Sequence, residues 1–353
     1  MASPQKIKTS ATELLGIKHP VLLAGMFNVA SPRLAAAVSN AGGLGVIGGV
    51  NYTPEKLQEA LNELKSYLVD KSAPFGVDLL IPQVGGSARK TNYDYSHGKL
   101  DELISIIIAS GAKLFVSAVG LPPKRVVDRL HANGVLYMNM IGHPKHAQKA
   151  IDIGADLICA QGGEGGGHTG EVATVILIPA VAKIIGTQKS AFTGLPIQLV
   201  AAGGLFNGQS LAAALMLGAS AVWVGTRFIL AEESGASEMH KRGLQEAGFD
   251  DIIRTTVFSG RPLNTRTSAY LRRWEGERKE EMGRLQAKGV IPIAHDMDAR
   301  PEDEEVLDNA HPVLMGRVAG LVNERGTARE IVDAMVEEAN QLLQRGGEIS
   351  SKL

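Results

Sequence analysis

The sequence predicts an α/β protein in which helices cover a parallel sheet. Eight short segments are rich in apolar and β-branched residues, which is typical of strands that are buried on both faces. The amphipathic stretches between them often begin at Ser, Thr or Pro and end at Gly, as helices do. Eight such strand–helix units in succession predict a TIM (β/α)8 barrel, and a doubly wound sheet is the alternative.

Each expected strand is a short apolar run, and each expected helix lies between two of these runs. The clearest helical patterns cover residues 53–70, 97–112, 122–134 and 145–155. In chain order the strands are VLLA from Val21, LGVIGG from Leu44, FGVDLLI from Phe75, KLFVSAV from Lys113, VLYMNMI from Val135, DLICAQ from Asp156, IQLVAAGG from Ile197 and AVWVGTRF from Ala221.

The alternation ends near residue 240, so we assign residues 1–240 to the barrel. Residues 257–289 predict helices with a charged exposed face, and residues 241–325 therefore form a smaller helical cap domain. The acidic, proline-broken stretch 296–312 predicts a loop. Residues 327–346 predict a last helix, within a segment 326–353 that packs back on the barrel and ends in a polar tail.

Composition narrows the possible partners to small molecules. The chain has 36 basic and 37 acidic side chains, so it lacks the basic excess that holds nucleic acid or an anionic membrane. No apolar run is long enough to span a bilayer. The single cysteine, Cys159, excludes a disulfide framework, and no carboxylate joins His143 and His146 at metal-binding spacing, so we expect no metal.

The last three residues, Ser351, Lys352 and Leu353, form the tripeptide that the peroxisomal import receptor recognises. We therefore expect a peroxisomal location through that receptor, and a cytoplasmic one otherwise.

Glycine is concentrated where the expected strands end, which is the edge of a TIM barrel that carries its chemistry. Gly203 and Gly204 follow the seventh strand, and Gly225 and Thr226 follow the eighth. These two loops commonly bind a phosphate through backbone N–H groups and a helix N-terminus. The sequence therefore predicts one phosphate pocket and a phosphorylated ligand.

The sixth strand is followed by the segment QGGEGGGHTGE, in which His168 stands among glycines. Glycine lets another group approach the backbone closely, so we expect a flat, large cofactor along this loop with His168 beside it. Gly165, Gly167 and Gly170 match the dinucleotide pattern G-x-G-x-x-G, but they follow a sixth strand rather than open a βαβ unit. We discount that match.

These segments resemble the FMN-dependent nitronate monooxygenases, formerly called 2-nitropropane dioxygenases, and their reductase relatives. The similarity covers roughly residues 15–265 and is carried by AGMFNVASPRLAAAVSNAGGLGVIGG, PFGVDLL, AQGGEGGGHTGE, AAGGLFNG, VGTRF and SGRP. The resemblance implies bound FMN and identifies His168 as the catalytic histidine. The FMN-binding residues that it implies are Gly25, Met26, Asp78, Gln161, Gly166, Gly167, Gly203, Gly204, Gly225 and Thr226.

Two positions depart from the family pattern. Asp78 replaces the usual asparagine after the third strand, and residues 164–168 read Glu-Gly-Gly-Gly-His in place of Glu-Ala-Gly-Gly-His. An anionic carboxylate near the flavin would disfavour a reduced, anionic ring.

The chemistry of a nitroalkane suits a histidine base. Its C–H beside the nitro group is acidic, and the neutral imidazole of His168 can remove that proton near pH 7. If the substrate arrives already as an anion, His168 would orient it instead. The resemblance implies that FMN and O2 then convert the nitronate to a carbonyl compound and nitrite. The alternative is an NAD(P)H-dependent flavin reductase of quinones or enoyl substrates, with residues of the cap deciding between the two.

Overall fold

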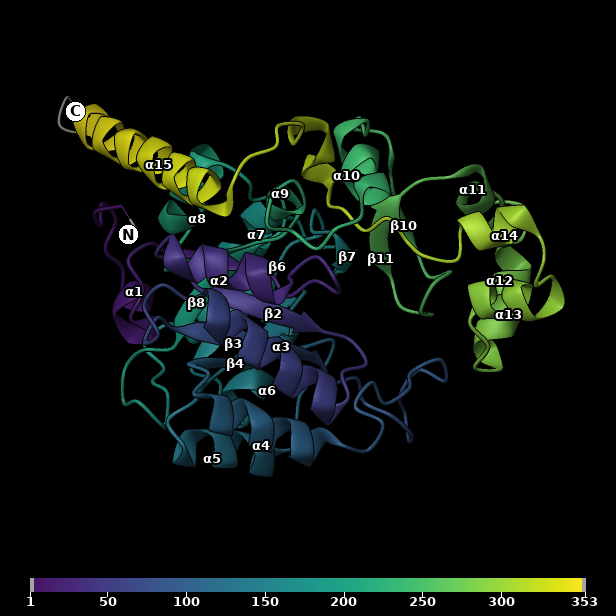
Figure 1. Cartoon of the computed structure of the whole chain (residues 1–353), viewed down its shortest axis with the longest axis horizontal. Helices are drawn as coiled ribbons and strands as arrows, with labels where there is room; N and C mark the ends of the chain where they lie inside the picture. The colour runs from purple at the N-terminus through teal and green to yellow at the C-terminus, as the bar shows by residue number, and fades with distance from the viewer. Residues whose placement is uncertain (1–2, 351–353) are drawn as a thin grey trace.

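The fold is a barrel of eight parallel strands, seen in a computed structural model that describes residues 3–350 (Figure 1). Neighbouring strands follow the order β1-β9-β8-β6-β5-β4-β3-β2, and a bridge between Leu22 and Leu44 joins the two end strands. The ring confirms the TIM barrel and excludes the open doubly wound sheet. Its strands are β1 Val21–Leu23, β2 Gly45–Gly49, β3 Phe75–Leu80, β4 Leu114–Ala118, β5 Leu136–Ile141, β6 Leu157–Gln161, β8 Gln198–Ala202 and β9 Ala221–Val224.

Most of the helices cover the outside of the ring, whereas the first helix, residues 10–15, packs against the barrel interior. Several of the helix ends carry the expected caps. Thr53 accepts a hydrogen bond from Lys56 N ahead of Pro54, and Gly111 ends the next helix in the left-handed conformation. The helices are α1 Ser10–Leu15, α2 Pro32–Asn40, α3 Pro54–Tyr67, α4 Leu100–Ser110, α5 Lys124–Ala132, α6 Ala147–Asp152, α7 Thr174–Ile185, α8 Gly208–Met216 and α9 Thr226–Ile229, with a 3-10 turn η1 Pro144–His146 before α6.

The strands bury both faces, which is why their sequences are almost wholly apolar. One set of side chains fills the barrel interior, including Val46, Val116, Met138 and Val200, and the alternate set packs against the helices. Cys159 lies in the interior, where burial raises the pKa of its thiol. The interior is a packed core, so ligands are left to the rim of the barrel.

The segment after the barrel begins with a helix and a β-hairpin, and four short helices follow. The expectation that residues 257–289 are helical throughout is wrong at their start, because Leu263–Arg266 pairs as a strand with two partners. The later part is helical as expected. The elements are α10 Glu238–Gln245, β10 Ile252–Thr255, β11 Leu263–Arg266, α11 Ala269–Glu275, α12 Lys279–Ala287, α13 Pro292–Ala299 and α14 Glu304–Asp308.

The loop expected at residues 296–312 is also wrong, since α13 and α14 lie there. Asp303 caps α14 by accepting a hydrogen bond from Val306 N. Asp296, one of the acidic residues that suggested a solvated loop, instead lies in α13 and pairs with two arginines, Arg278 and Arg300. Figure 1 shows these helices as a small lobe beside the barrel.

The last helix, α15 Ala328–Ser350, packs back on the barrel as expected and lies over α8 (Figure 1). Its apolar face, with Ile331, Val332 and Met335, is buried, and Glu338 accepts a hydrogen bond from Gly208 N at 2.7 Å. Before it, the 3-10 turn η2 Arg317–Leu321 leads back from the cap.

Two remaining expectations concern the whole chain. Ser351, Lys352 and Leu353 lie outside the described residues, so the targeting signal stays a prediction. None of the described helices is both long and apolar enough to cross a membrane.

Candidate active site

The glycine-rich loop after β6 is packed tightly against the rest of the chain. A methyl group at Gly162 would lie 2.0 Å from Thr174 Oγ1, and one at Gly166 would lie 2.7 Å from the carbonyl carbon of Met315. Gly163 and Gly165 are crowded in the same way, whereas Gly167 has no atom within 3.9 Å of that position. At four of these five glycines, the group that closely approaches the backbone is therefore another part of the protein.

His168 is held by a short three-stranded sheet that the sequence did not predict. β7 Gly167–His168 pairs with β11, which also pairs with β10, and Leu263 stands opposite His168. The hairpin of the cap therefore fixes the backbone of the histidine.

Asn264, next in β11, fastens the loop further. Its buried Nδ2 donates to the carbonyl oxygens of Gly163 and Gly165, at 2.8 and 2.7 Å. An asparagine in a short polar strand gave no sign of this role in the sequence.

The imidazole of His168 is neutral at physiological pH. Burial lowers its pKa to about 4, and the positive charge of Arg261 adds to that effect. Nε2 lies 2.8 Å from Ser259 Oγ, and Nδ1 has no hydrogen-bond partner among the described residues. The site therefore contains a histidine in its base form with one ring nitrogen available.

Asp78 lies within β3, two residues before its end and not after the strand as expected, and its carboxyl group is almost wholly buried. Burial raises the pKa of this group to about 8, and Oδ1 has no hydrogen-bond partner. The expected anionic carboxylate is therefore mostly a neutral carboxylic acid at pH 7. A methyl group at Gly25 would lie 2.3 Å from Asp78 Oδ2, so β1 and β3 bring these two predicted residues together.

The two expected phosphate loops meet at the rim of the barrel. Gly203 and Gly204 have φ of 96° and 72°, a conformation that glycine adopts readily. Among the described residues no acceptor pairs with the backbone N–H groups of Gly203, Gly204, Gly225 and Thr226. The hydroxyl of Thr226 is already engaged, since it accepts a hydrogen bond from Gly316 N at 3.0 Å.

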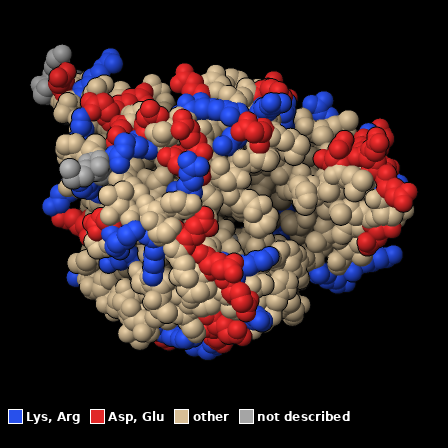
Figure 2. Space-filling view, in the orientation of Figure 1, with Lys and Arg blue, Asp and Glu red and all other residues tan. Residues whose placement is uncertain are grey.

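Two further predicted residues border this rim. Met26 packs partly buried against three hydrophobic clusters, with its sulfur 3.4 Å from the position of a methyl group at Gly225. Gln161 ends β6, and its Nε2 donates to Gly166 O over 3.4 Å. Figure 2 shows the surface hollowed between the barrel and the cap.

These features fit a flavin mononucleotide. Unpaired N–H groups in two adjoining loops suit a single phosphate, and the buried Oδ1 of Asp78 lacks the partner that a polar ring system could supply. The residues that would hold the group lie on one rim of the barrel.

Comparison with known proteins shows the family of the chain. A model of the nitronate monooxygenase family matches residues 8–338. The chain belongs to the nitronate monooxygenase family. Its TIM barrel is also the fold of the solved structures that it resembles.

Individual relatives of this family member carry different names. A Mycobacterium tuberculosis protein named (3aS,4S,5R,7aS)-5-hydroxy-7a-methyl-1-oxo-octahydro-1H-indene-4-carboxyl-CoA dehydrogenase is 39% identical over 73% of the chain, and the match covers 65% of that relative's length. A probable nitronate monooxygenase of Staphylococcus saprophyticus is 30% identical over 73% of the chain and 78% of its own length. The solved structure of FabK from Thermotoga maritima is 28% identical, with a TM-score of 0.78 over 97% of this chain and 99% of that one.

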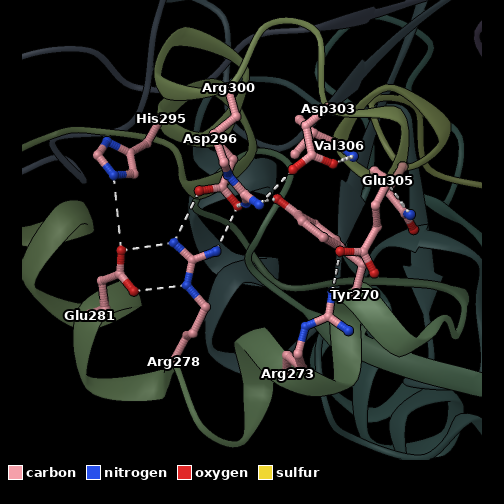
Figure 3. Close-up of polar contacts among 11 residues, drawn as sticks. Tyr270, Arg273, Arg278, Glu281, His295, Asp296, Arg300, Asp303, Glu305 and Val306 are labelled. Carbon is pink, nitrogen blue, oxygen red and sulfur yellow. Dashed lines mark hydrogen bonds and ion pairs between the residues drawn. The ribbon is translucent and has the colours of Figure 1, made fainter.

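A separate polar cluster in the cap of this nitronate monooxygenase family member (Figure 3) lines an open pocket of about 450 Å³. Asp296 is buried there and accepts hydrogen bonds from Tyr270 at 2.8 Å and from Arg278 at 2.7 Å. Burial alone would raise the pKa of Asp296, but hydrogen bonds from Arg278 and Tyr270 bring it below its usual value. Each arginine of the cavity wall pairs with a carboxylate, so the cluster holds the cap helices together.

Proposed function

We propose that this chain is an FMN-dependent nitronate monooxygenase in which His168 is the general base. The observation that carries the proposal is the partly buried, neutral imidazole held at the rim that fits a flavin. A base of this kind accepts a proton from carbon only if it is uncharged beforehand, which the lowered pKa of His168 provides.

The hydrogen bonds of His168 indicate which nitrogen receives the proton. Ser259 Oγ donates to the carbonyl oxygen of Arg261 at 3.3 Å, and we assign to His168 the tautomer in which its Nε2–H donates to Ser259. Nδ1 then carries the free lone pair. When a nitroalkane transfers its C–H proton to Nδ1, the electron pair of that bond passes to the nitro group, and a nitronate and an imidazolium result.

The rim would hold the cofactor for the next stage. Gly203, Gly204, Gly225 and Thr226 would bind the phosphate of FMN, with Gly25, Asp78 and Gln161 near its ring. FMN, when bound, supplies the redox chemistry that passes electrons from the nitronate to O2 and gives a carbonyl compound and nitrite.

A second candidate is oxidation or reduction of an acyl thioester. The observation that favours it is the 39% identity to a relative named as a CoA-ester dehydrogenase. In such a reaction His168 would exchange a proton at the carbon beside the thioester carbonyl, and NAD(P)H could serve as the other redox partner.

One experiment separates the two candidates. The purified yellow protein is mixed under anaerobic conditions with propyl-2-nitronate, NADH, NADPH or an enoyl-CoA, and the flavin absorbance is followed. Bleaching by the nitronate, with nitrite released when air is admitted, is the expected result. Bleaching by NADH or NADPH, reversed by the enoyl-CoA and absent with the nitronate, would overturn the proposal in favour of the reductase.

A further inference from the structure

Arg261 reaches the same site from the turn between β10 and β11, two residues after Ser259. Its Nη1 donates to Asn92 Oδ1 at 3.2 Å, and its Nη2 donates to the carbonyl oxygen of Val119 at 3.1 Å. The guanidinium lies near enough to His168 to lower the pKa of the imidazole. Arg261 therefore joins the cap hairpin to the loop that follows β3 and to the end of β4, near His168.

The charge of Arg261 has no counter-ion. Its two acceptors are neutral, and within residues 3–350 no carboxylate pairs with it. Partial burial lowers the pKa of Arg261, and the nearby charge of Arg89 lowers it further. Other arginines of the same hairpin are different, because Arg254 pairs with Glu171 and Arg266 pairs with Glu246.

An uncompensated cation that is partly removed from water costs free energy. The two contacts of Arg261 use only some of the N–H donors of a guanidinium, so others remain for a ligand. An anion next to His168 would supply both the missing charge and the missing acceptors.

The backbone at Val119 provides an independent sign of function. Its φ is 72°, which is unfavourable for a β-branched residue and is usually kept only where the surrounding structure demands it. This conformation presents the carbonyl oxygen of Val119 to Arg261 and so holds the guanidinium at the site.

We propose that Arg261 binds the negatively charged oxygen atoms of the substrate and thereby selects nitronates over neutral nitroalkanes. A guanidinium matches a planar group with two oxygens, such as a nitronate, through paired N–H···O bonds. The inference rests on the proposed function for its substrate class. The anion site itself rests on the charge and contacts of Arg261.

The test compares Arg261→Gln with the matched control Arg266→Gln, which removes a paired arginine from the same hairpin. Loss of a charge-assisted hydrogen bond of about 1.5–3 kcal/mol corresponds to roughly a 10- to 150-fold loss of affinity. KM for propyl-2-nitronate should rise by about that factor in Arg261→Gln, whereas KM for neutral 2-nitropropane should change less than about threefold. Arg261→Lys should fall between the wild type and Arg261→Gln, and Arg266→Gln should match the wild type.

Nitrate provides a readout that needs no turnover. We expect isothermal titration calorimetry to show nitrate binding to the purified holoprotein, weakened by a similar factor in Arg261→Gln. Equal nitrate affinity in the two proteins, or equal KM changes for both substrates, would overturn the proposal. If Arg261→Gln does not fold, Arg261→Lys is used for the test. In that case, an Arg261→Lys variant with wild-type affinity for nitrate and a wild-type KM for the nitronate would refute the proposal. If the wild type oxidises neither substrate, the proposed function fails, and the nitrate measurement still decides the anion site.

Discussion

At the residue scale, burial shifts the pKa values of two groups of the site in opposite directions. It lowers the pKa of His168 to about 4 and raises that of Asp78 to about 8, so both are mostly neutral at pH 7. A neutral histidine accepts a proton, and a neutral carboxyl group donates a hydrogen bond. The positive charge near His168 belongs to Arg261. The rim thus pairs a proton acceptor with a fixed cation.

Asp78 makes flavin binding depend on pH. Since the pKa of Asp78 is raised in the folded protein, the favourable neutral form is lost as pH rises through about 8. The affinity of the apoprotein for FMN should therefore fall between pH 7 and 9, while that of Asp78→Asn stays constant. Titration of FMN fluorescence with apoprotein measures both. The same decline in the two proteins would show that another group is responsible.

At the element scale, the cap hairpin positions the loop that carries His168. β11 pairs with β7, and Asn264 donates to two carbonyl oxygens of the glycine-rich loop. The barrel supplies the rim, and the hairpin orders the segment that lies on it. The backbone position of His168 therefore depends on an element outside the barrel.

Replacing Asn264 by alanine should loosen this loop. It leaves two buried carbonyl oxygens without donors, and each such loss costs about 1–3 kcal/mol. We expect a lower midpoint of thermal unfolding and a reduced kcat, measured by calorimetry and steady-state kinetics. Asn62→Ala, on the exposed face of α3, is the control and should change neither quantity. An unchanged kcat in Asn264→Ala would show that turnover does not require the hairpin to order the glycine-rich loop.

The barrel was predictable because its signal is local, whereas the hairpin was not. Runs such as LGVIGG and IQLVAAGG show buried strands directly, and all eight form in the expected order. Leu263–Arg266 becomes a strand only because β10 and β7 lie beside it, which no local pattern reveals. The glycines of the expected phosphate loops and His168 could be singled out from the sequence because they too form local patterns, directly after predicted strands. Asn264 and the unpaired charge of Arg261 depend on distant neighbours.

At the scale of the whole molecule, α15 fastens the chain end to the barrel (Figure 1). Gly208, the first residue of α8, is in contact with this helix: a methyl group there would lie 2.4 Å from Glu338 Cβ and 2.5 Å from Ala339 N. No atom lies within 4 Å of the same position at Gly283 in α12. The two glycines therefore differ in packing, although both lie in helices.

Alanine at these two glycines should have opposite effects on stability. Helix propensity alone favours alanine over glycine by about 1 kcal/mol in a helix interior, so Gly283→Ala should raise the midpoint of thermal unfolding. In Gly208→Ala the clash with α15 should outweigh propensity and lower the midpoint. Calorimetry of the two variants measures the difference. A rise in both would mean that α15 does not pack on α8 as described.

The central claim is that His168 removes the proton of a nitroalkane in a flavin-dependent oxidation, and His168→Asn tests it most directly. The measurement is nitrite release by wild type and variant from 2-nitropropane and from propyl-2-nitronate, at equal flavin content. Because general base catalysis contributes roughly 10²- to 10⁴-fold, turnover of the neutral nitroalkane should fall by that factor, with a much smaller loss for the nitronate. An equal loss on both substrates, or no loss on the nitroalkane, would contradict the account.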